Sequence, residues 1–370
     1  MLQIFGSKHR FLWGWLGASS LILFLGISGC VISPRRTLGG GGGGGTPTPT
    51  PSPTASPTPT PGATPAGKLY VSNGGANSIV RFDQALTASG NIVPGATISG
   101  AATTLTAPAY ITLDVAADRL FVANNGDLSV LIFDNISTKN GNVAPSRTIF
   151  GAATLLSAPT DVALDSSRNL LYVADDTQVE VFASASTASG NIAPARSLSV
   201  GFTIGAVFID STNDRMFLAD PAGNAITVYD SASTLATGPI TASRTIQGAA
   251  THLAMPSGIQ VDGLGRLVIS NTASASMTIY PNAAGANGNI APAAEIVGSN
   301  TGFSSPDQII LNTAGTGSVY NADPGAARVA IFGNLSTATG NIAPTRTITG
   351  PSTTLTTAGR PVGVALDITR

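Results

Sequence analysis

The chain has 370 residues, of which 43% are hydrophobic and only 10% are charged, with a formal net charge of −1. A charge balance this close to zero does not favour nucleic acid as a partner, and a single cysteine excludes an intramolecular disulfide. The length fits one large domain, since about 300 residues of repeats can form a single all-β ring.

Residues 1–29 are predicted to be a lipoprotein signal peptide. Lys8 and Arg10 supply a positive start, and residues 11–29 are uncharged and mostly apolar. The segment ends in Ile27-Ser28-Gly29-Cys30, which resembles the bacterial lipobox, in which small residues precede a cysteine that is lipidated on its sulfur. The alternative is an uncleaved membrane helix, because about 19 apolar residues can just span a bilayer.

This resemblance implies a bacterial lipoprotein that is anchored to a membrane through lipidated Cys30 and lies in the cell envelope, outside the cytoplasm. Residues 30–67 then form a disordered stalk. Seven consecutive glycines, residues 39–45, make a flexible hinge, and the Pro/Thr-rich stretch after them favours an extended polyproline-like rod. The stalk would hold the rest of the chain away from the membrane.

Residues 68–370 are predicted to be a repeat array. A turn of the form GN-x-x-P places its glycine at Gly90, Gly141, Gly190, Gly288 and Gly340, and a degenerate copy places Gly238 between the third and fourth of these. The spacings are 51, 49, 48, 50 and 52 residues. Each repeat holds four short runs rich in Val, Ile, Leu and aromatic residues, bounded by turn formers. A period of about 40 to 50 residues with four strands predicts a propeller blade.

Counting strands predicts six blades. The inner-strand pattern appears at residues 110–114, 161–165, 206–210, 258–262, 308–312 and 363–367. The next strand appears at residues 69–73, 120–124, 171–175, 216–220, 267–271 and 318–322. Because the chain enters on a second strand and leaves on an inner strand, we expect the C-terminal strand to close the ring by pairing with the N-terminal strands.

Two of the repeats read PTDVALDSSRNLLYVADDTQVEVF and PSGIQVDGLGRLVISNTASASMTIY. They resemble the blades of NHL-type and YVTN-type β-propellers. The resemblance covers residues 68–370 and implies an all-β, six-bladed propeller with four-stranded blades. It does not imply one function, because such propellers include enzymes, scaffolds and binding modules.

Polar residues that recur in the blades are interpreted as structural. Most inner strands end in aspartate and most second strands end in Asn or Asp, positions where a side chain can cap the following turn through backbone amides. The outermost strands repeat an arginine, which we interpret as protection of an exposed sheet edge. A basic rim for an acidic partner is the alternative. The residues concerned are Asp114, Asp165, Asp210, Asp262 and Asp367; Asn73, Asn124, Asp175, Asp220 and Asn271; and Arg147, Arg196, Arg244 and Arg346.

Function is better sought where the copies differ. The two residues after the proline that enters each inner strand should line one mouth of the central channel, and most are small and apolar. Tyr110, Asp161, Asp307 and Gln308 break this pattern and are the candidate binding residues. The alternative is that they are ordinary solvent-facing polar residues. Asp161 and Asp307 lie three blades apart, which places them too far from each other to share a metal ion directly.

The composition offers little for catalysis, and no catalytic residue is predicted. His252 is the only histidine after the leader, so neither a Ser-His-Asp arrangement nor a zinc site is indicated. Gluconolactonase-like propellers hold calcium with a glutamate among its ligands, whereas Glu180 and Glu295, the only glutamates of the sequence, fall on a third and an outer strand. We therefore predict no cofactor and leave calcium open.

Three functions remain. The first is a lipid-anchored, non-enzymatic module that binds an envelope or extracellular ligand, with a protein or a glycan as the expected partner. The second is a hydrolase or lyase that uses a divalent cation in the central channel. The third is a purely structural envelope protein.

Overall fold

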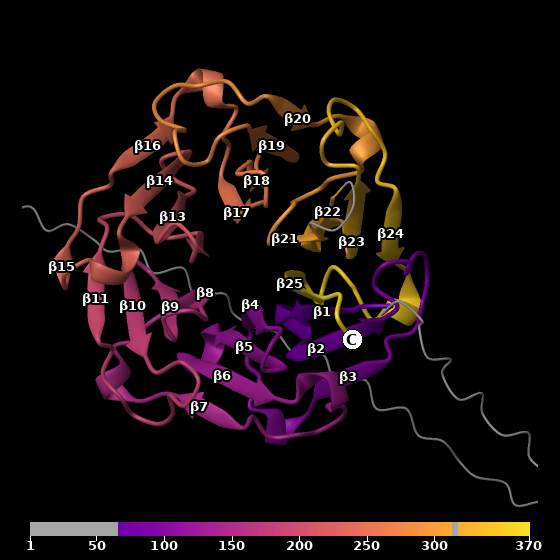
Figure 1. The fold of residues 1–370 in the computed structure, drawn as a ribbon. Coiled ribbons are helices and arrows are strands. Elements are labelled where there is room, and N and C mark those ends of the chain that lie inside the picture. The colour runs from indigo at the N-terminus through magenta and orange to yellow at the C-terminus, as the bar shows by residue number, and fades with distance from the viewer. Residues whose placement is uncertain (1–65, 313–316) are drawn as a thin grey trace, which may run out of the picture. The chain divides into compact units, whose positions relative to one another are not determined.

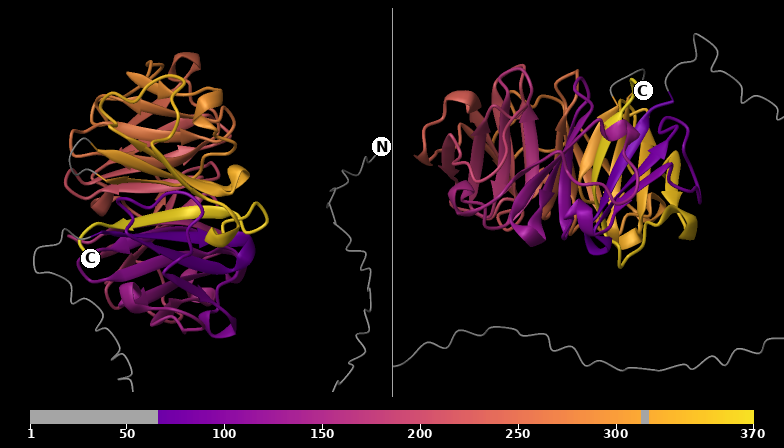
Figure 2. Two further views of the ribbon diagram at one scale, coloured as in Figure 1. Left: turned by 90° about the vertical axis from the view of Figure 1, so that its right-hand side faces the viewer. Right: turned by 90° about the horizontal axis from the view of Figure 1, so that it is seen from below.

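The computed structural model describes residues 66–312 and 317–370, which form a ring of six antiparallel sheets. Figure 1 looks along the axis of the ring, and Figure 2 shows the same sheets from two sides. The predicted signal peptide, Cys30 and residues 31–65 of the stalk lie outside the described residues.

Each blade has four strands, which are named below in order from the centre of the ring outward. Blade 1 is β25 (Pro361–Asp367), β1 (Lys68–Asn73), β2 (Ser78–Asp83) and β3 (Ala96–Ser99); blade 2 is β4 (Pro108–Asp114), β5 (Arg119–Asn124), β6 (Ser129–Asp134) and β7 (Arg147–Ile149). Blade 3 is β8 (Pro159–Asp165), β9 (Leu170–Asp175), β10 (Gln178–Ala183) and β11 (Arg196–Ser199); blade 4 is β12 (Ala206–Asp210), β13 (Arg215–Asp220), β14 (Ala225–Asp230) and β16 (Arg244–Gln247). Blade 5 is β17 (Pro256–Val261), β18 (Leu267–Asn271), β19 (Ser276–Tyr280) and β20 (Ala294–Ile296); blade 6 is β21 (Ile309–Asn312), β22 (Ser318–Asp323), β23 (Arg328–Gly333) and β24 (Arg346–Thr349).

Short 3-10 turns join these strands, and a two-residue strand, β15 (Gly238–Pro239), adds to the outer edge of blade 3. The turns in the described residues are η1 (Gly74–Ala76), η2 (Ala101–Thr103), η3 (Asn125–Asp127), η4 (Ile136–Thr138), η5 (Ala152–Thr154), η6 (Ala232–Thr234), η7 (Ala249–Thr251), η8 (Ser299–Thr301), η9 (Pro324–Ala326) and η10 (Pro351–Thr353). No helix in residues 66–312 or 317–370 is long and apolar enough to cross a membrane.

The ring closes as predicted. β25, the last strand of the chain, pairs antiparallel with β1, the first, with Leu69 opposite Leu366 and Val71 opposite Val364. Blade 1 therefore contains both ends of the described chain (Figure 1). This pairing removes the two free sheet edges that an open array of the same strands would expose.

The hydrophobic core is divided into six layers, one at each interface between neighbouring blades. At the interface of blades 2 and 3, for example, Phe121 and Ile132 pack with Leu171 and Val173. Val179 of β10 points to the other side of blade 3 and packs with residues of blade 4. Successive strand residues point to opposite faces of a sheet, so each blade contributes to two layers.

The glycine of the GN-x-x-P turn marks the contact between outer strands of adjacent blades. Gly190, at the entrance to β11 of blade 3, forms a parallel bridge with Ile149 of blade 2, and the other copies form the same bridge one blade further on. The asparagine after it accepts a hydrogen bond from the 3-10 turn of the preceding blade, as Asn191 does from the Ala153 amide at 2.8 Å. The corresponding asparagines are Asn91, Asn142, Asn289 and Asn341. We call this contact the asparagine latch.

Each latch needs a glycine in the partner blade. Gly151 has a φ of 110°, in the region that favours glycine, and a Cβ there would lie 2.6 Å from Oδ1 of Asn191. The copy at Gly238 lacks the asparagine, and in this repeat the chain pairs as β15 with β11 through Gly238 and Pro239. The degenerate repeat thus keeps the bridge and loses the side-chain latch.

Candidate functional site

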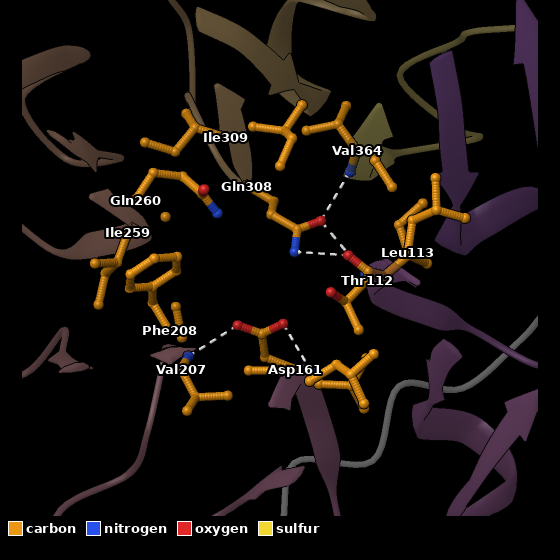
Figure 3. Close-up of a pocket in the computed structure, with 18 of the residues that line it drawn as sticks. Thr112, Leu113, Asp161, Val207, Phe208, Ile259, Gln260, Gln308, Ile309 and Val364 are labelled. Carbon is orange, nitrogen blue, oxygen red and sulfur yellow. Dashed lines mark hydrogen bonds between the residues drawn. The ribbon is translucent and has the colours of Figure 1, made fainter. Parts of the chain in front are cut away.

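The six inner strands enclose a cavity of about 230 Å³ on the axis of the ring. Asp161 of β8 and Gln308, which directly precedes β21, line it together with apolar residues of the other inner strands. Figure 3 shows the side chains of Asp161 and Gln308 pointing into this cavity from opposite walls. Two of the four predicted binding residues therefore lie inside the ring and not at its mouth.

Asp161 is held by the backbone of two blades. Its side chain is buried, and its two oxygens accept hydrogen bonds from the amide of Val162 at 2.7 Å and from that of Val207 in blade 4 at 2.8 Å. Burial raises the pKa of Asp161 to about 8, and the two amide donors act in the opposite direction. The bond from Val207 joins β8 to β12, and the bond from Val162 stays within β8, so both oxygens are occupied by backbone amides in a structural role.

Gln308 also joins blades. Its Nε2 donates to the carbonyl oxygen of Ile111 in blade 2 at 3.1 Å, and its Oε1 accepts from the amide of Val364 in blade 1 at 2.8 Å. Gly363 makes room for this contact, since a Cβ there would lie 3.1 Å from Oε1 of Gln308 and 2.4 Å from Oγ of Ser72. The side chain of Gln308 therefore bridges blades 6, 1 and 2 beneath the mouth of the channel.

Tyr110 and Asp307 meet at the mouth itself. The hydroxyl of Tyr110, at the start of β4, donates to Oδ1 of Asp307, which precedes β21. Both residues line a pocket of about 460 Å³, the mouth pocket, whose walls include the apolar side chains of Pro108, Ala109 and Val362. Burial raises the pKa of Asp307 to about 8; the nearby Arg360 lowers it and Asp323 raises it. Burial therefore favours the uncharged form of the Asp307 carboxyl.

Sequence reasoning missed Arg360. It lies directly before the proline that starts β25, has a φ of 49° and lines the mouth pocket beside Asp307. The residues directly before this proline in other blades are Ala107, Ala158, Met255 and Ser305. Comparing the residue before each proline, as well as the two after it, would have identified the single charged side chain at this position.

A second hollow, of about 700 Å³, lies at the other end of the inner strands between blades 4 and 5. It is lined by turn residues such as Ser211 and Gly263, with Leu264 strongly exposed at its side. The charged residues that line it are already paired: Arg215 forms an ion pair with Asp230, Asp210 accepts from the side-chain amide of Asn213, and Asp262 accepts hydrogen bonds from the amides of Leu264 and Arg266. This hollow therefore offers no unpaired charged side chain among the described residues that line it.

The recurring aspartates of the inner strands cap the following turns as predicted, whereas most residues of the second-strand set bind the loop that enters the inner strand of their own blade. Asp165, for example, accepts from the amide of Arg168 in the following turn at 3.1 Å, and Asp175 accepts from the amides of Ser157 and Ala158. The other residues of the set that make turn or loop contacts are Asp114, Asp210, Asp262, Asp367, Asn73, Asn124, Asp220 and Asn271.

The interpretation of the outer-strand arginines as exposed edge charges is wrong. Arg196 donates to the carbonyl oxygens of Ala232 and Leu235 in blade 4, and Arg346 donates to those of Ala85 and Ala88 in blade 1. Arg147 pairs with Asp134 and contacts the Ala185 carbonyl, while Arg244 pairs with Asp230. Three of the four arginines therefore bind the next blade, and none forms a free basic rim.

The remaining titratable candidates do not form a catalytic group. Nδ1 of His252 lies 2.8 Å from Oε2 of Glu295 in a half-exposed pair, and neither residue lines the central cavity or the mouth pocket. Glu180 lies on β10 and Glu295 on β20, as expected from the sequence. In the described parts of the chain, no three residues among His, Cys, Asp and Glu are grouped so that they could hold a metal ion.

No family model and no curated protein sequence matches the chain. Solved structures do match. A chain of a nidogen/laminin complex aligns with a TM-score of 0.56 at 13% identity, over 81% of this chain and 97% of that one. A chain of Kuenenia stuttgartiensis hydrazine synthase aligns with a TM-score of 0.46 at 17% identity, over 64% of this chain and 66% of that one.

The first of these similarities, together with the six four-stranded blades, defines the class of protein as a six-bladed β-propeller. At 13% identity it shows the fold alone, and function has to be argued from the site.

Proposed function

We propose that this chain is a propeller of the NHL or YVTN type that binds an envelope or extracellular ligand in its mouth pocket. One observation carries the proposal. Tyr110, Arg360 and Asp307, each of which departs from the residue type of the other copies, come from the three consecutive blades 2, 1 and 6 and line the same pocket. Asp161 and Gln308 also depart from the other copies, but their polar atoms are used in bonds to backbone groups inside the ring. Arg360, in contrast, lines the pocket without a side-chain hydrogen bond among the described residues.

The proposed location outside the cytoplasm depends on the sequence of residues 1–30. The order of positive start, apolar run and Ile27-Ser28-Gly29-Cys30 supports lipidation at Cys30. A lipid anchor followed by the Gly/Pro/Thr-rich stalk would present the ring to ligands outside the membrane. The nidogen/laminin chain, a similar propeller found in a complex between two proteins, agrees with an interaction role.

The pocket is tested by thermal unfolding of residues 66–370, whose ring closes on itself through β1 and β25. The protein is heated with extracts of envelope and growth medium, each divided into small-molecule and macromolecular fractions. A ligand that binds only the folded state raises its stability, by about 2.7 kcal/mol at a hundredfold excess over Kd.

Two variants assign such a shift to a site. Ala109→Trp fills the mouth pocket, whereas Gly263→Trp places the same bulk in the hollow at the other end, where the glycine has open space around it. We expect the shift to disappear with Ala109→Trp and to persist with Gly263→Trp. A shift that both variants keep, or that only Gly263→Trp loses, would contradict a ligand site at the mouth.

The anchor is tested separately. In the full chain, Cys30→Ser should move the protein from the membrane fraction to the soluble fraction and abolish incorporation of labelled palmitate. Membrane retention without palmitate incorporation in the unchanged chain would instead support the uncleaved helix.

A further inference from the structure

Arg360 differs from every other arginine in the described residues. The side chains of the other eleven, from Arg81 to Arg370, all donate hydrogen bonds to carboxylates, carbonyl oxygens or a hydroxyl. Arg360 makes no side-chain hydrogen bond or ion pair in residues 66–312 and 317–370, although it stands in the wall of a pocket. A guanidinium with five donors and a permanent charge is thus available to a ligand.

The backbone under Arg360 is held in place. Its carbonyl oxygen accepts from the amide of Gly74 at 3.0 Å, that of Gly359 accepts from Gly75 at 2.8 Å, and its own amide donates to Thr356 at 2.9 Å. These bonds connect the loop before β25 with the loop after β1. The first and last strands of the described chain therefore both support the backbone at Arg360. A fixed backbone reduces the ordering cost when the side chain binds a ligand.

The groups around Arg360 do not neutralise it. Asp307 is the one carboxyl among the described residues that line the pocket; its Oδ1 accepts from the Tyr110 hydroxyl, and burial, which raises its pKa to about 8, favours its uncharged form. Asp323, the other acidic group that Asp307 senses, is buried and accepts from the amides of Ser304 and Ser305. The pocket therefore combines one cationic side chain, Arg360, with a carboxyl whose uncharged form is favoured.

The walls select for more than charge. Pro108, Ala109 and Val362 present apolar surface, and the volume of about 460 Å³ falls within the range of about 300 to 1,000 Å³ that holds small molecules. A compact, strongly hydrated anion would leave these walls without contacts. A planar carboxylate fits the fork of an arginine with two parallel hydrogen bonds.

We infer that the mouth pocket binds a small organic carboxylate, with its carboxylate on Arg360 and its apolar body against Pro108, Ala109 and Val362. This inference rests on the proposed function of the same pocket and specifies the class of ligand.

The test uses three probes on residues 66–370, with binding measured by calorimetry at pH 7: 3-phenylpropionate, its uncharged amide and inorganic phosphate. We expect the acid to bind in the millimolar range or tighter, the amide to bind at least about tenfold more weakly, and phosphate not to compete. Equal binding of acid and amide, displacement by phosphate, or no binding of the acid would each overturn the inference.

Arg360→Gln removes the charge at nearly the same length, and Arg360→Lys keeps the charge without the fork. Both keep a non-glycine residue at φ 49°, so they add no backbone strain at this position. We expect Gln to abolish the preference of acid over amide and Lys to keep part of it. Lys139 lies in the connection between η4 and β7 and does not line the mouth pocket. Lys139→Gln lowers the net charge by the same amount and should leave the binding of both probes unchanged.

The outcomes separate this inference from the proposed function. Suppose that a natural ligand binds the unchanged protein but not Ala109→Trp, while the carboxylate probe does not bind the unchanged protein. The mouth pocket is then the binding site, and the assigned ligand class is wrong. If neither the natural ligand nor the probe depends on the pocket, both proposals fail together.

Discussion

At the scale of single residues, comparing the six copies separates positions that build the ring from positions that are particular to one blade. Glu180 is the clearest example outside the pocket. It lies opposite Val173 on β9 and on the side of blade 3 that packs against blade 2, where the corresponding residues of other blades are Val80, Leu131, Thr227, Thr278 and Ala330. One of its oxygens accepts from Ser197 at 2.8 Å, and the other has no partner among the described residues.

This environment predicts a pH-dependent stability. Burial raises the pKa of Glu180 to about 7, the Ser197 hydroxyl lowers it and Asp175 raises it. Between the unfolded pKa near 4.5 and the folded value, the native state binds more protons, so stability falls as the pH rises through this window and stays lower above it. We expect Glu180→Gln to stabilise the fold at pH 8 by up to roughly 3 kcal/mol and to have little effect at pH 4.

Urea unfolding across this range measures the effect, with Asp127→Asn, in the exposed turn η3, as the control. A pH slope that is the same in the wild type and Glu180→Gln would show that the buried carboxyl is not its source.

Gly363 gives a second prediction at this scale. Its added Cβ would meet Ser72, Ala109 and Gln308, so Gly363→Ala should destabilise the fold by about 1–3 kcal/mol through overpacking at the junction of blades 6, 1 and 2. Gly263→Ala, where nothing lies within 4 Å of the new atom, is the matched control and should be close to neutral. Equal unfolding midpoints for the two variants in guanidinium would contradict the tight junction.

At the scale of elements, the asparagine latch connects each outer strand with the preceding blade. Asn191→Ala removes the acceptor for the Ala153 amide and should cost about 0.5–1.5 kcal/mol, because the exposed amide can still bond to water. Asn191→Asp keeps an acceptor oxygen and should cost less.

The latches lie apart from one another, so their effects should add. Asn191→Ala and Asn341→Ala act on the blade 2–3 and blade 5–6 junctions, and the double variant should lose the sum of the two single losses within about 0.5 kcal/mol. Chemical unfolding of the four proteins measures this. If the double variant loses much less stability than the sum of the two single losses, breaking one junction already weakens the other.

For the ring as a whole, stability depends on closure. Removing residues 361–370 deletes β25 and exposes the edge of β1. It also removes Val364 and Leu366 from the core between blades 6 and 1, where a single large-to-small substitution typically lowers the free energy of unfolding by about 2–5 kcal/mol. We expect this truncation to abolish cooperative unfolding in calorimetry.

A circular permutant is the control for the truncation. Because Lys68 pairs directly with Asp367, residues 361–370 can be joined ahead of residue 66 by a short turn, and the new order should restore a single cooperative transition. Cooperative unfolding of the truncated chain would show that β25 is not needed to hold the ring together.

The repeat pattern alone accounts for much of this protein. The 50-residue period, the six copies of each strand pattern and the phase of the first and last strands predicted the blade count and the closing pair. They could do so because hydrophobic alternation and turn residues act locally and recur in every copy. The same reasoning correctly predicted that the recurring aspartates of the inner strands cap turns, but it did not predict that Asn124, Asp175 and Asn271 bind an earlier loop.

Which of the unusual residues meet depends on the folded ring. Asp161, Gln308, Tyr110 and Asp307 occupy similar places in their repeats, yet the first two are used inside the ring by amides of other blades while the last two reach the mouth pocket. Arg360 joins Tyr110 and Asp307 there although it is 250 residues away from Tyr110 in the chain. Contacts between blades depend on closure of the ring, which brings distant segments together and leaves no local pattern that could reveal them.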